Sequence, residues 1–403
     1  MSTTLQIPAA RPPSQDAVLA YAWTSGEFTA TEAMEATGLT RSTAIDAMDA
    51  LARLGLLREL PNARLSGDYR KGRPARRFAL RDDAAVLVGV DAGHEHVTVT
   101  VADLRSHPVA TRRETLALDR DDAATRSALI QASIDEAIRE AGRSREDVLA
   151  ICVGVPAPVN SAGRSPRHPN GFWERMNPNL IDALAWAPIA RIDNDASLAA
   201  VAEGTVGAAV GCRDYIALLA GGRLGAGVVV DGNVLRGSHG GVGEMVAFDH
   251  VDGVGTADGL GARAARWAAE AVAGGQAAGS ALAEVPPEQL DGRVVLELAA
   301  RGDQAARDIV ERVGGVLARI VSVLGSMFDP QRVVISGAIS AGVDDVVTAA
   351  RRSLPTDLDL PAPELVVSRL GADVVVTGAV AAAAAAARAQ ALDVWTAGAR
   401  AAG

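Results

Sequence analysis

The segment AVLVGVDAGHEHVTVTV, residues 85–101, decides the fold class because it joins two apolar runs through a glycine-containing turn. Val86–Val90 has the continuous apolar pattern of a buried strand, and Val97–Val101 is rich in the β-branched residues that favour strands. Similar runs follow and alternate with alanine-rich helical segments such as Ala123–Ala141 and Gln304–Ser326. This alternation predicts an α/β architecture for most of the chain. The further predicted strands are Leu149–Val155, Tyr215–Leu219, Val228–Val230 and Val333–Ser336.

Three short helical patterns precede this α/β region. Ser14 is the expected cap of the first helix, Thr31 begins the second, and Thr40 is the expected cap of the third. Gly38 supplies a tight turn between the second and third helices, which is a helix-turn-helix layout. Two strands at residues 56–60 and 76–80 follow, joined by a turn. The third helix carries apolar residues at helical spacing that we assign to the core: Ala44, Ile45, Met48 and Leu51.

The second helix of such a motif enters the major groove of DNA, and its first residues face base edges and phosphates. Here the first residues combine small hydroxyl donors with one arginine that can bind a guanine through two hydrogen bonds. The turn between the two strands is a basic wing, and it holds the only lysine of the chain. A solubilising hairpin tip is the alternative interpretation of the wing. The predicted DNA-binding residues are Thr40, Arg41, Ser42, Thr43, Arg70, Lys71, Gly72, Arg73 and Arg76.

The charge of the chain is divided unevenly between this region and the rest. The formal net charge is -10, yet Arg41 to Arg81 carries ten basic against four acidic residues, a local balance of +6. The remainder therefore carries -16. A basic block on an acidic body suits a protein with one end that faces nucleic acid. From charge alone, a solvated charged linker remains an alternative.

Length and composition exclude several classes of protein. At 403 residues the chain predicts more than one domain. The longest apolar run, Ala379–Ala387, is shorter than the roughly 18–20 residues that a bilayer span needs. Met1–Ala10 lacks a basic stretch followed by an apolar one, so we expect no signal peptide. Cys152 and Cys212 are too few for a disulfide framework. We expect a cytoplasmic protein without a membrane partner.

Several glycine- and aspartate-containing segments occur in a recognisable order. They are Gly89–Gly93, Gly154–Val159, Ile192–Ala196 and Gly225–Glu244, followed by Ser336–Ala338 and Gly378–Ala379. In this order they resemble the ROK family, which groups bacterial sugar kinases with sugar-responsive repressors on the actin-like ATPase fold. The N-terminal winged helix-turn-helix resembles the repressor branch, since the kinases lack it. The resemblance implies a two-lobed, ribonuclease H-like α/β domain behind the DNA-binding module.

The expected domain boundaries follow from this resemblance. They are a loose arm at 1–13, the winged helix-turn-helix at 14–81, lobe 1 at 84–205 completed by a C-terminal helix at about 379–400, and lobe 2 at 206–378.

The resemblance also implies a set of site residues. Asp91, Gly93, Gly225 and Gly227 match the two phosphate loops of the kinases. The residues that match the sugar site are Asn170, Trp173, Asn194, Asp195 and Glu244, and Asp195 is the general base in the kinases. As an alternative, Asp193, Asn194 and Asp195 cap the helix that follows them.

Departures from the kinase pattern predict that catalysis is lost. His94 and Glu95 replace the Gly-Thr of the first loop, and a carboxylate there repels a triphosphate. Gly222 and Arg223 replace the Thr-Gly of the second loop. Arg223 is expected to hold phosphate, to pair with Glu95, or to be an ordinary surface arginine. Asp195 is then a vestigial base.

We also expect no cofactor and no metal. The zinc-binding His that follows the family's sugar-site Glu is missing, since Glu244 is followed by Met245 and then Val246-Ala247. Structural zinc needs about four nitrogen or sulfur ligands, and too few are available here.

Three functions are compatible with these observations. The favoured one is a transcription regulator of carbohydrate-related genes, and repression is the favoured direction of control. It would bind double-stranded DNA at an inverted-repeat operator as a homodimer or homotetramer and respond to a sugar-like effector. The first alternative is an active ATP-dependent sugar kinase with an added DNA-binding domain. The second is a constitutive DNA-binding protein whose large domain only forms oligomers.

Overall fold

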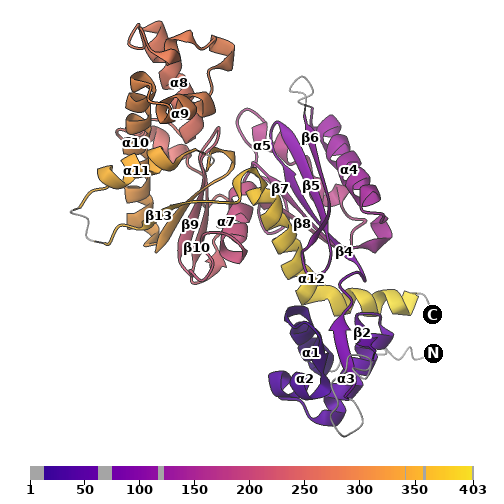
Figure 1. The fold of residues 1–403 in the computed structure, drawn as a ribbon. Helices are drawn as coiled ribbons and strands as arrows, with labels where there is room; N and C mark the ends of the chain where they lie inside the picture. Colours follow the sequence, from indigo (N-terminus) through magenta and orange to yellow (C-terminus); the bar gives the residue numbers. More distant parts are fainter. Residues whose placement is uncertain (1–12, 62–74, 117–121, 341, 357–359, 402–403) are drawn as a thin grey trace.

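The computed structural model describes residues 13–61, 75–116, 122–340, 342–356 and 360–401. These residues form an N-terminal module and two larger lobes (Figure 1). Nearly all of the predicted arm lies outside the described residues, as do the wing residues Arg70, Lys71, Gly72 and Arg73.

The N-terminal module is a three-helix unit with a small sheet. Its helices are α1 (Pro13–Thr24), α2 (Ala30–Thr37) and α3 (Arg41–Arg53). Its sheet has the order β1-β3-β2, with β1 at Phe28–Thr29, β2 at Leu57–Leu60 and β3 at Arg77–Leu80. All neighbouring strands are antiparallel. The predicted winged helix-turn-helix layout is therefore present.

The helix starts in this module differ in part from the predictions. Thr40 caps α3 as predicted, accepting from the backbone N–H of Thr43. Ser14 does not cap α1, because the helix already begins at Pro13, whose fixed φ suits a first helical position. The cap of α2 is Thr29 rather than Thr31, since Thr29 forms a reciprocal capping box with Glu32.

The core face of α3 also differs by one position from the prediction. Ala44, Met48 and Leu51 are buried as expected, but Ile45 is only partly buried, and Ala47 takes its place. Positions 44, 47, 48 and 51 follow the three-and-four spacing of one helix face, and position 45 lies outside that face.

Lobe 1 is built on a five-stranded sheet of order β6-β5-β4-β7-β8. Strands β4, β5 and β6 are antiparallel neighbours, whereas β4, β7 and β8 run parallel. The main covering helices are α4 (Ala123–Glu140) and α12 (Val374–Ala401), with short α5 (Phe172–Met176) and α6 (Leu180–Ala183) before β8. The strands are β4 (Val86–Ala92), β5 (His96–Ala102), β6 (Pro108–Thr115), β7 (Val148–Val155) and β8 (Ile189–Asn194).

Lobe 2 repeats this topology in a second sheet of order β11-β10-β9-β12-β13. Again three strands are antiparallel neighbours and three run parallel. The repeated strand order confirms the predicted two-lobed α/β fold. The strands are β9 (Tyr215–Leu219), β10 (Gly225–Val230), β11 (Asn233–Val234), β12 (Arg332–Ser336) and β13 (Glu364–Val367). The helices are α8 (Leu260–Ala273), α9 (Gly292–Ala300), α10 (Gln304–Phe328) and α11 (Asp344–Ser353).

Two helices lie between the sheets: α7 (Asp195–Thr205) and α12. They approach closely at Gly378, where any side chain would overlap the carbonyl oxygen of Leu198. Within the described residues, the segment Gly371–Ala397 of α12 is long and apolar enough to cross a bilayer. Most of it is buried inside the protein, which is equally typical of a core helix, so it is weak evidence for a membrane span.

Candidate functional site

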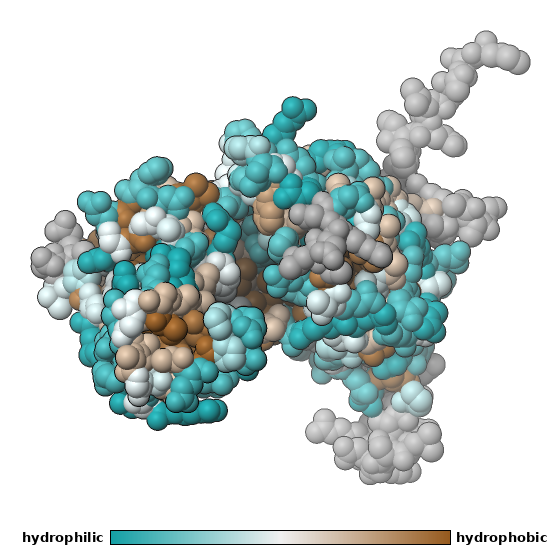
Figure 2. Space-filling view, turned by 90° about the horizontal axis from the view of Figure 1, so that it is seen from above, coloured by the Kyte–Doolittle hydropathy of each residue, from teal (hydrophilic) through white to brown (hydrophobic). Residues whose placement is uncertain are grey.

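The predicted sugar site lies where the two lobes face each other, and Figure 2 shows a hollow between them. Asp91 is the penultimate residue of β4, Asp195 begins α7, and Glu244 forms a backbone bridge with Gly225 of β10. Asp91 and Glu244 both lie close enough to Asp195 to raise the pKa of its carboxyl group. The structure therefore brings together three carboxylates that are far apart in the sequence.

Asp195 has the electrostatic character of a proton acceptor at neutral pH. Burial is the largest cause that raises its pKa, to about 7, and the bond it accepts from the Ala196 N–H opposes the shift. A carboxylate with a pKa near the working pH suits both a general base and a hydrogen-bond partner for a hydroxyl group.

Glu244 reaches the cleft because of the glycine before it. Gly243 has φ 91°, and a side chain there would overlap the carbonyl oxygen of Ala226. Burial raises the pKa of Glu244, while the charges of Arg223 and His168 lower it. His168 belongs to lobe 1, so Glu244 of lobe 2 lies within reach of lobe 1 side chains.

Asn194 is the cap of α7, as the alternative interpretation of this stretch proposes. Its side-chain oxygen accepts from the Ser197 N–H at 3.0 Å, and its Nδ2 donates to the carbonyl oxygen of Ala157 at 3.2 Å. Both ends of the amide thus have partners within the protein. A ligand hydroxyl would have to share the Asn194 amide with these two partners. The capping role and the predicted sugar contact are compatible only if the amide makes both sets of hydrogen bonds.

Asn170 and Trp173 lie in a loop and short helix that carry several aromatic rings. The Asn170 side-chain oxygen accepts from the Phe172 N–H at 3.0 Å and lies 2.5 Å from Nδ1 of His168. The His168 ring meets the edge of Trp173 with centroids 4.5 Å apart, and His94 lies 5.7 Å from the Phe172 ring. These residues form an aromatic surface of lobe 1 next to the first loop.

The first loop contains a contact that the sequence analysis did not predict. Nε2 of His96 lies 2.9 Å from the Asp91 carboxylate, and a side chain at Gly93 would touch the His96 ring. Behind the loop, the buried Arg126 donates to the carbonyl oxygens of Ala92 at 2.6 Å and Gly93 at 2.9 Å. Asp91, which matches the first phosphate loop of the kinases, is therefore already paired with a histidine.

The second loop is arranged differently. Gly225 and Gly227 belong to β10, and a side chain at Gly227 would overlap the backbone of Ala196 on α7. Glycine at 227 is therefore required for β10 to pack on α7. Arg223 and Glu95 are both exposed and form no ion pair with each other, so the structure does not bear out that one of the three alternatives for Arg223. Arg223 instead bridges Asp258 through its backbone and lies near Glu244.

Within the described residues, no group of three or more His, Cys, Asp or Glu side chains is arranged to hold a metal ion.

A separate open pocket of about 610 Å³ lies between α4 and the segment from Glu174 to Asn179, and none of the predicted ligand residues lines it.

At the other end of the molecule, the start of α3 is open to solvent. Thr40, Arg41 and Ser42 are exposed, and the Thr40 hydroxyl lies 2.8 Å from that of Thr43. Among the described residues Arg41 has neither an ion pair nor a hydrogen bond, so its guanidinium group is available to an external partner. The N-terminus of α3 also favours a negatively charged group such as a phosphate.

Arg76 is held within the module. Its guanidinium group forms two 2.8 Å bonds to Glu59 and a 2.8 Å ion pair with Asp49, and it lies 4.8 Å from the centroid of the Phe78 ring. The bond to Glu59 is the largest cause that raises the pKa of Arg76. A DNA phosphate would compete with two carboxylates for this side chain.

Sequence reasoning missed His96 and Arg126, and their signals were weak. His96 faces Asp91 only because β4 and β5 form a hairpin in which Ala92 pairs with Val97. The one available signal was a third polar residue directly after His94 and Glu95. Arg126 is an arginine on a helix face that otherwise carries Ile130 and Ile134, and such a residue needs a buried partner.

Comparison with known proteins agrees with this arrangement. Residues 87–388 match the profile of the ROK family. The DNA-binding transcriptional dual regulator NagC of Escherichia coli is 26% identical over 300 residues, which cover 71% of this chain and 70% of NagC.

Two solved structures match different shares of this chain. A ROK family transcriptional regulator, a homologue of the Escherichia coli Mlc protein, superimposes with a TM-score of 0.70 at 20% identity, covering 93% of this chain and 96% of its own. A ROK family glucokinase from Streptomyces griseus, bound to glucose and AMPPNP, has a TM-score of 0.62 at 22% identity and covers 74% of this chain and 99% of its own. The regulator thus covers more of this chain than the kinase does. With three quarters of its length matched by the profile, the chain belongs to the ROK family.

Proposed function

We propose that this protein is a DNA-binding transcription regulator of carbohydrate-related genes, and that it responds to a sugar or sugar derivative bound between its lobes. The observation that carries this proposal is the winged helix-turn-helix with an open recognition-helix start, joined to a sugar-kinase-like fold. NagC, a named DNA-binding regulator, is similar over 71% of this chain.

On the DNA side, Arg41 is the residue we expect to read a base. Thr40, Ser42 and Thr43 would contact phosphates or base edges, and the wing residues Arg70, Lys71, Gly72 and Arg73 would follow the neighbouring minor groove. Since Arg76 is paired with two carboxylates, its contribution is secondary. We propose an inverted-repeat operator bound by a homodimer or homotetramer, because paired half-sites mirror a two-fold symmetric protein. Repression is the favoured direction of control.

On the ligand side, Asp195 and Glu244 offer carboxylates from opposite lobes to a molecule rich in hydroxyl groups. Asn170, Asn194 and Trp173 belong to lobe 1, and we propose that they complete the site. Binding to both lobes favours a closed arrangement, and this difference in affinity between open and closed states is what shifts a regulator.

We propose that the lobes do not act as an efficient kinase. Phosphoryl transfer depends on positioning phosphates and neutralising their charge, and Asp91 is already occupied by His96. One observation favours the kinase alternative: a pKa of about 7 suits Asp195 as a base. Measuring ADP release with hexoses and amino sugars separates the two functions. We also propose a cytoplasmic location, where a DNA-binding regulator meets its operator.

The experiment that tests the proposal is mapping of genomic binding sites, followed by binding measurements with a mapped fragment. We expect affinity to fall by orders of magnitude from about 50 to about 200 mM salt, because phosphate contacts release counterions. Arg41→Ala should weaken binding to the mapped site about tenfold or more. Arg53→Ala is the matched control, since this exposed arginine lies at the other end of α3. Salt-independent binding, or equal losses in both variants, would contradict the proposal.

A further inference from the structure

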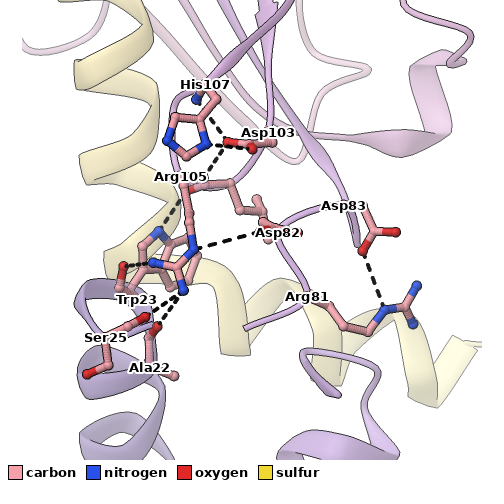
Figure 3. Close-up of polar contacts among 10 residues, drawn as sticks. Ala22, Trp23, Ser25, Arg81, Asp82, Asp83, Asp103, Arg105 and His107 are labelled. Atoms are coloured by element: carbon pink, nitrogen blue, oxygen red, sulfur yellow. Dashed lines mark hydrogen bonds and ion pairs between the residues drawn. The ribbon is translucent and has the colours of Figure 1, made fainter. Parts of the chain in front are cut away.

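The turn between β5 and β6, residues 103–107, contacts the N-terminal module directly (Figure 3). We call it the junction turn. The indole Nε1 of Trp23, in α1, donates a 2.8 Å hydrogen bond to the carbonyl oxygen of Leu104. Both residues are almost fully buried. A hydrogen bond between residues 81 positions apart therefore lies inside the contact between module and lobe 1.

Arg105 of the junction turn caps the end of α1. The last carbonyl groups of a helix lack partners within it and carry partial negative charge, and α1 has no basic residue in its last turn. Arg105 donates to three of the carbonyl oxygens around this end: Ala22 at 3.4 Å, Trp23 at 3.2 Å and Ser25 at 2.6 Å. Arg105, a residue of lobe 1, thus supplies the cap that α1 lacks within the module.

The junction turn is itself well ordered by hydrogen bonds. Asp103 accepts from the backbone N–H groups of Arg105 at 2.8 Å and His107 at 2.9 Å, and from Nδ1 of His107 at 3.0 Å. Ser106 adopts the left-handed conformation with φ 69°. Arg105 is therefore presented to α1 from a fixed backbone.

The other end of β5 lies at the proposed ligand site between the lobes. β5 begins at His96, which contacts Asp91, and ends at Ala102, one residue before the junction turn. Seven extended residues span roughly 20 Å. From Val97 to Ala102 the strand is buried, between β4 and β6. A close-packed strand of this kind moves as a unit rather than bending.

On the α3 side, a pocket interrupts the contact between the module and lobe 1. An open pocket of about 510 Å³ lies between the end of α3 and lobe 1, lined by Leu54, Leu149 and Trp395 among others. A contact at α1 combined with space beneath α3 allows the recognition helix to rotate about the junction turn.

We propose that β5 and the junction turn couple the ligand cleft to the recognition helix, with Arg105 and Trp23 as the residues that transmit the movement. This inference rests on the proposed function, because it assigns the regulatory connection between its two sites.

Hydrogen exchange of the full-length protein tests the coupling without any ligand. Arg105→Ala should accelerate exchange about tenfold or more both in α1 and in the segment from His94 to Ala102. Trp23→Phe keeps an aromatic side chain, although a smaller one, and removes the donor, so it should affect the same two segments more weakly. Arg81→Ala is the matched control, because Arg81 lies at the same junction in an exposed 3.7 Å pair with Asp83. It should leave both segments within about twofold of the parent protein. Acceleration confined to α1 in both test variants would overturn the proposal.

A second measurement adds a DNA fragment from a mapped binding site. Coupling is reciprocal, so DNA bound at α3 should also slow exchange between His94 and Ala102 in the parent protein. In Arg105→Ala only the start of α3 should be protected. Equal remote protection in both proteins would overturn the coupling. Absence of protection at Thr40–Thr43 in the parent would instead contradict DNA binding, and the ligand-free measurement would still decide the coupling.

Discussion

The turn from β4 to β5 in lobe 1 and the turn from β9 to β10 in lobe 2 occupy the same position in two sheets of the same strand order. The first is occupied by side chains: His96 contacts Asp91, and Arg126 binds the loop carbonyls. The second is open, with no atom within 4 Å of where a side chain at Gly221 or Gly222 would begin.

This difference shows that equivalent turns of the two sheets are held in place in different ways. In lobe 2 the turn is held through its backbone, since the N–H groups of Gly259 and Leu260 donate to the carbonyl oxygens of Gly222 and Ala220. Backbone contacts therefore hold the turn of lobe 2, while lobe 1 places a histidine against its aspartate. A kinase needs both halves, so we expect the change in lobe 1 alone to impair phosphoryl transfer.

The largest expected effect concerns the rate of phosphoryl transfer. With the lobe 1 turn occupied, we expect ADP release at least about a thousandfold below the roughly 1–100 s⁻¹ of ordinary kinases. A coupled assay across hexoses and amino sugars measures this rate. Turnover within the ordinary range would show that both turns still bind phosphate, and the comparison between them would lose its functional meaning.

The next largest effect separates two glycines of the same hairpin. Gly227→Ala would place a methyl group against the backbone of Ala196 and the side chain of Ala200, so we expect a loss of about 2–3 kcal/mol in unfolding free energy. Gly222→Ala meets open space and should change stability by less than about 0.5 kcal/mol. Urea unfolding measures both. Equal losses would mean that the second turn is as tightly packed as the strand.

The sequence predicted the buried strands closely because they are continuous apolar runs. Val333–Ser336 and Leu149–Val155 each differ from the observed strand by one residue. β6 was missed since it is an edge strand that begins at Pro108 and exposes its arginines, a pattern that resembles a loop.

The candidate site was predictable only in part. Asp195 and Glu244 lie within glycine- and aspartate-containing segments whose order resembles that of the ROK family. The contacts of His96 and Arg105 depend instead on hairpin geometry and on the way the module packs, and Arg105 meets Trp23 across 82 positions of sequence. No local pattern encodes such a distance.

The third prediction concerns Asp195, which lies between the two turns. Its folded pKa of about 7 exceeds the ordinary 3.8, so the folded protein keeps this proton where the unfolded chain has lost it. Stability therefore falls as the pH rises from about 4 to about 7, and the cost persists above that range. Asp195→Asn removes the charged form and should stabilise the protein at about pH 8 by on the order of 1–2 kcal/mol, after allowing for water in the cleft.

Urea unfolding of Asp195→Asn at about pH 5 and about pH 8 measures this difference. Asp252→Asn serves as control, since this exposed carboxylate has no ion pair or hydrogen bond among the described residues. If the gain from Asp195→Asn is the same at both pH values, the aspartate is hydrated rather than buried between the turns.

The smallest expected effect tests the contact that occupies the lobe 1 turn. The bond to Asp91 is the largest cause that raises the pKa of His96. The stabilisation it provides is therefore complete below the ordinary pKa of about 6.5 and is lost as the pH rises through the raised value. His96→Gln keeps a polar group without the charge. Because the histidine is 43% exposed, we expect it to cost only about 0.5–1 kcal/mol at about pH 5.5 and nothing at about pH 8.5.

His250→Gln, at an exposed histidine of lobe 2, should change stability equally little at both pH values. A cost for His96→Gln that does not depend on pH would mean that the ring acts by packing against Gly93 alone. The His96 ring would then fill the lobe 1 turn without forming an ion pair, and the Asp91 carboxylate would remain available to a cation. Because that outcome would remove the main electrostatic difference between the two turns, this small effect tests the comparison more directly than the larger ones do.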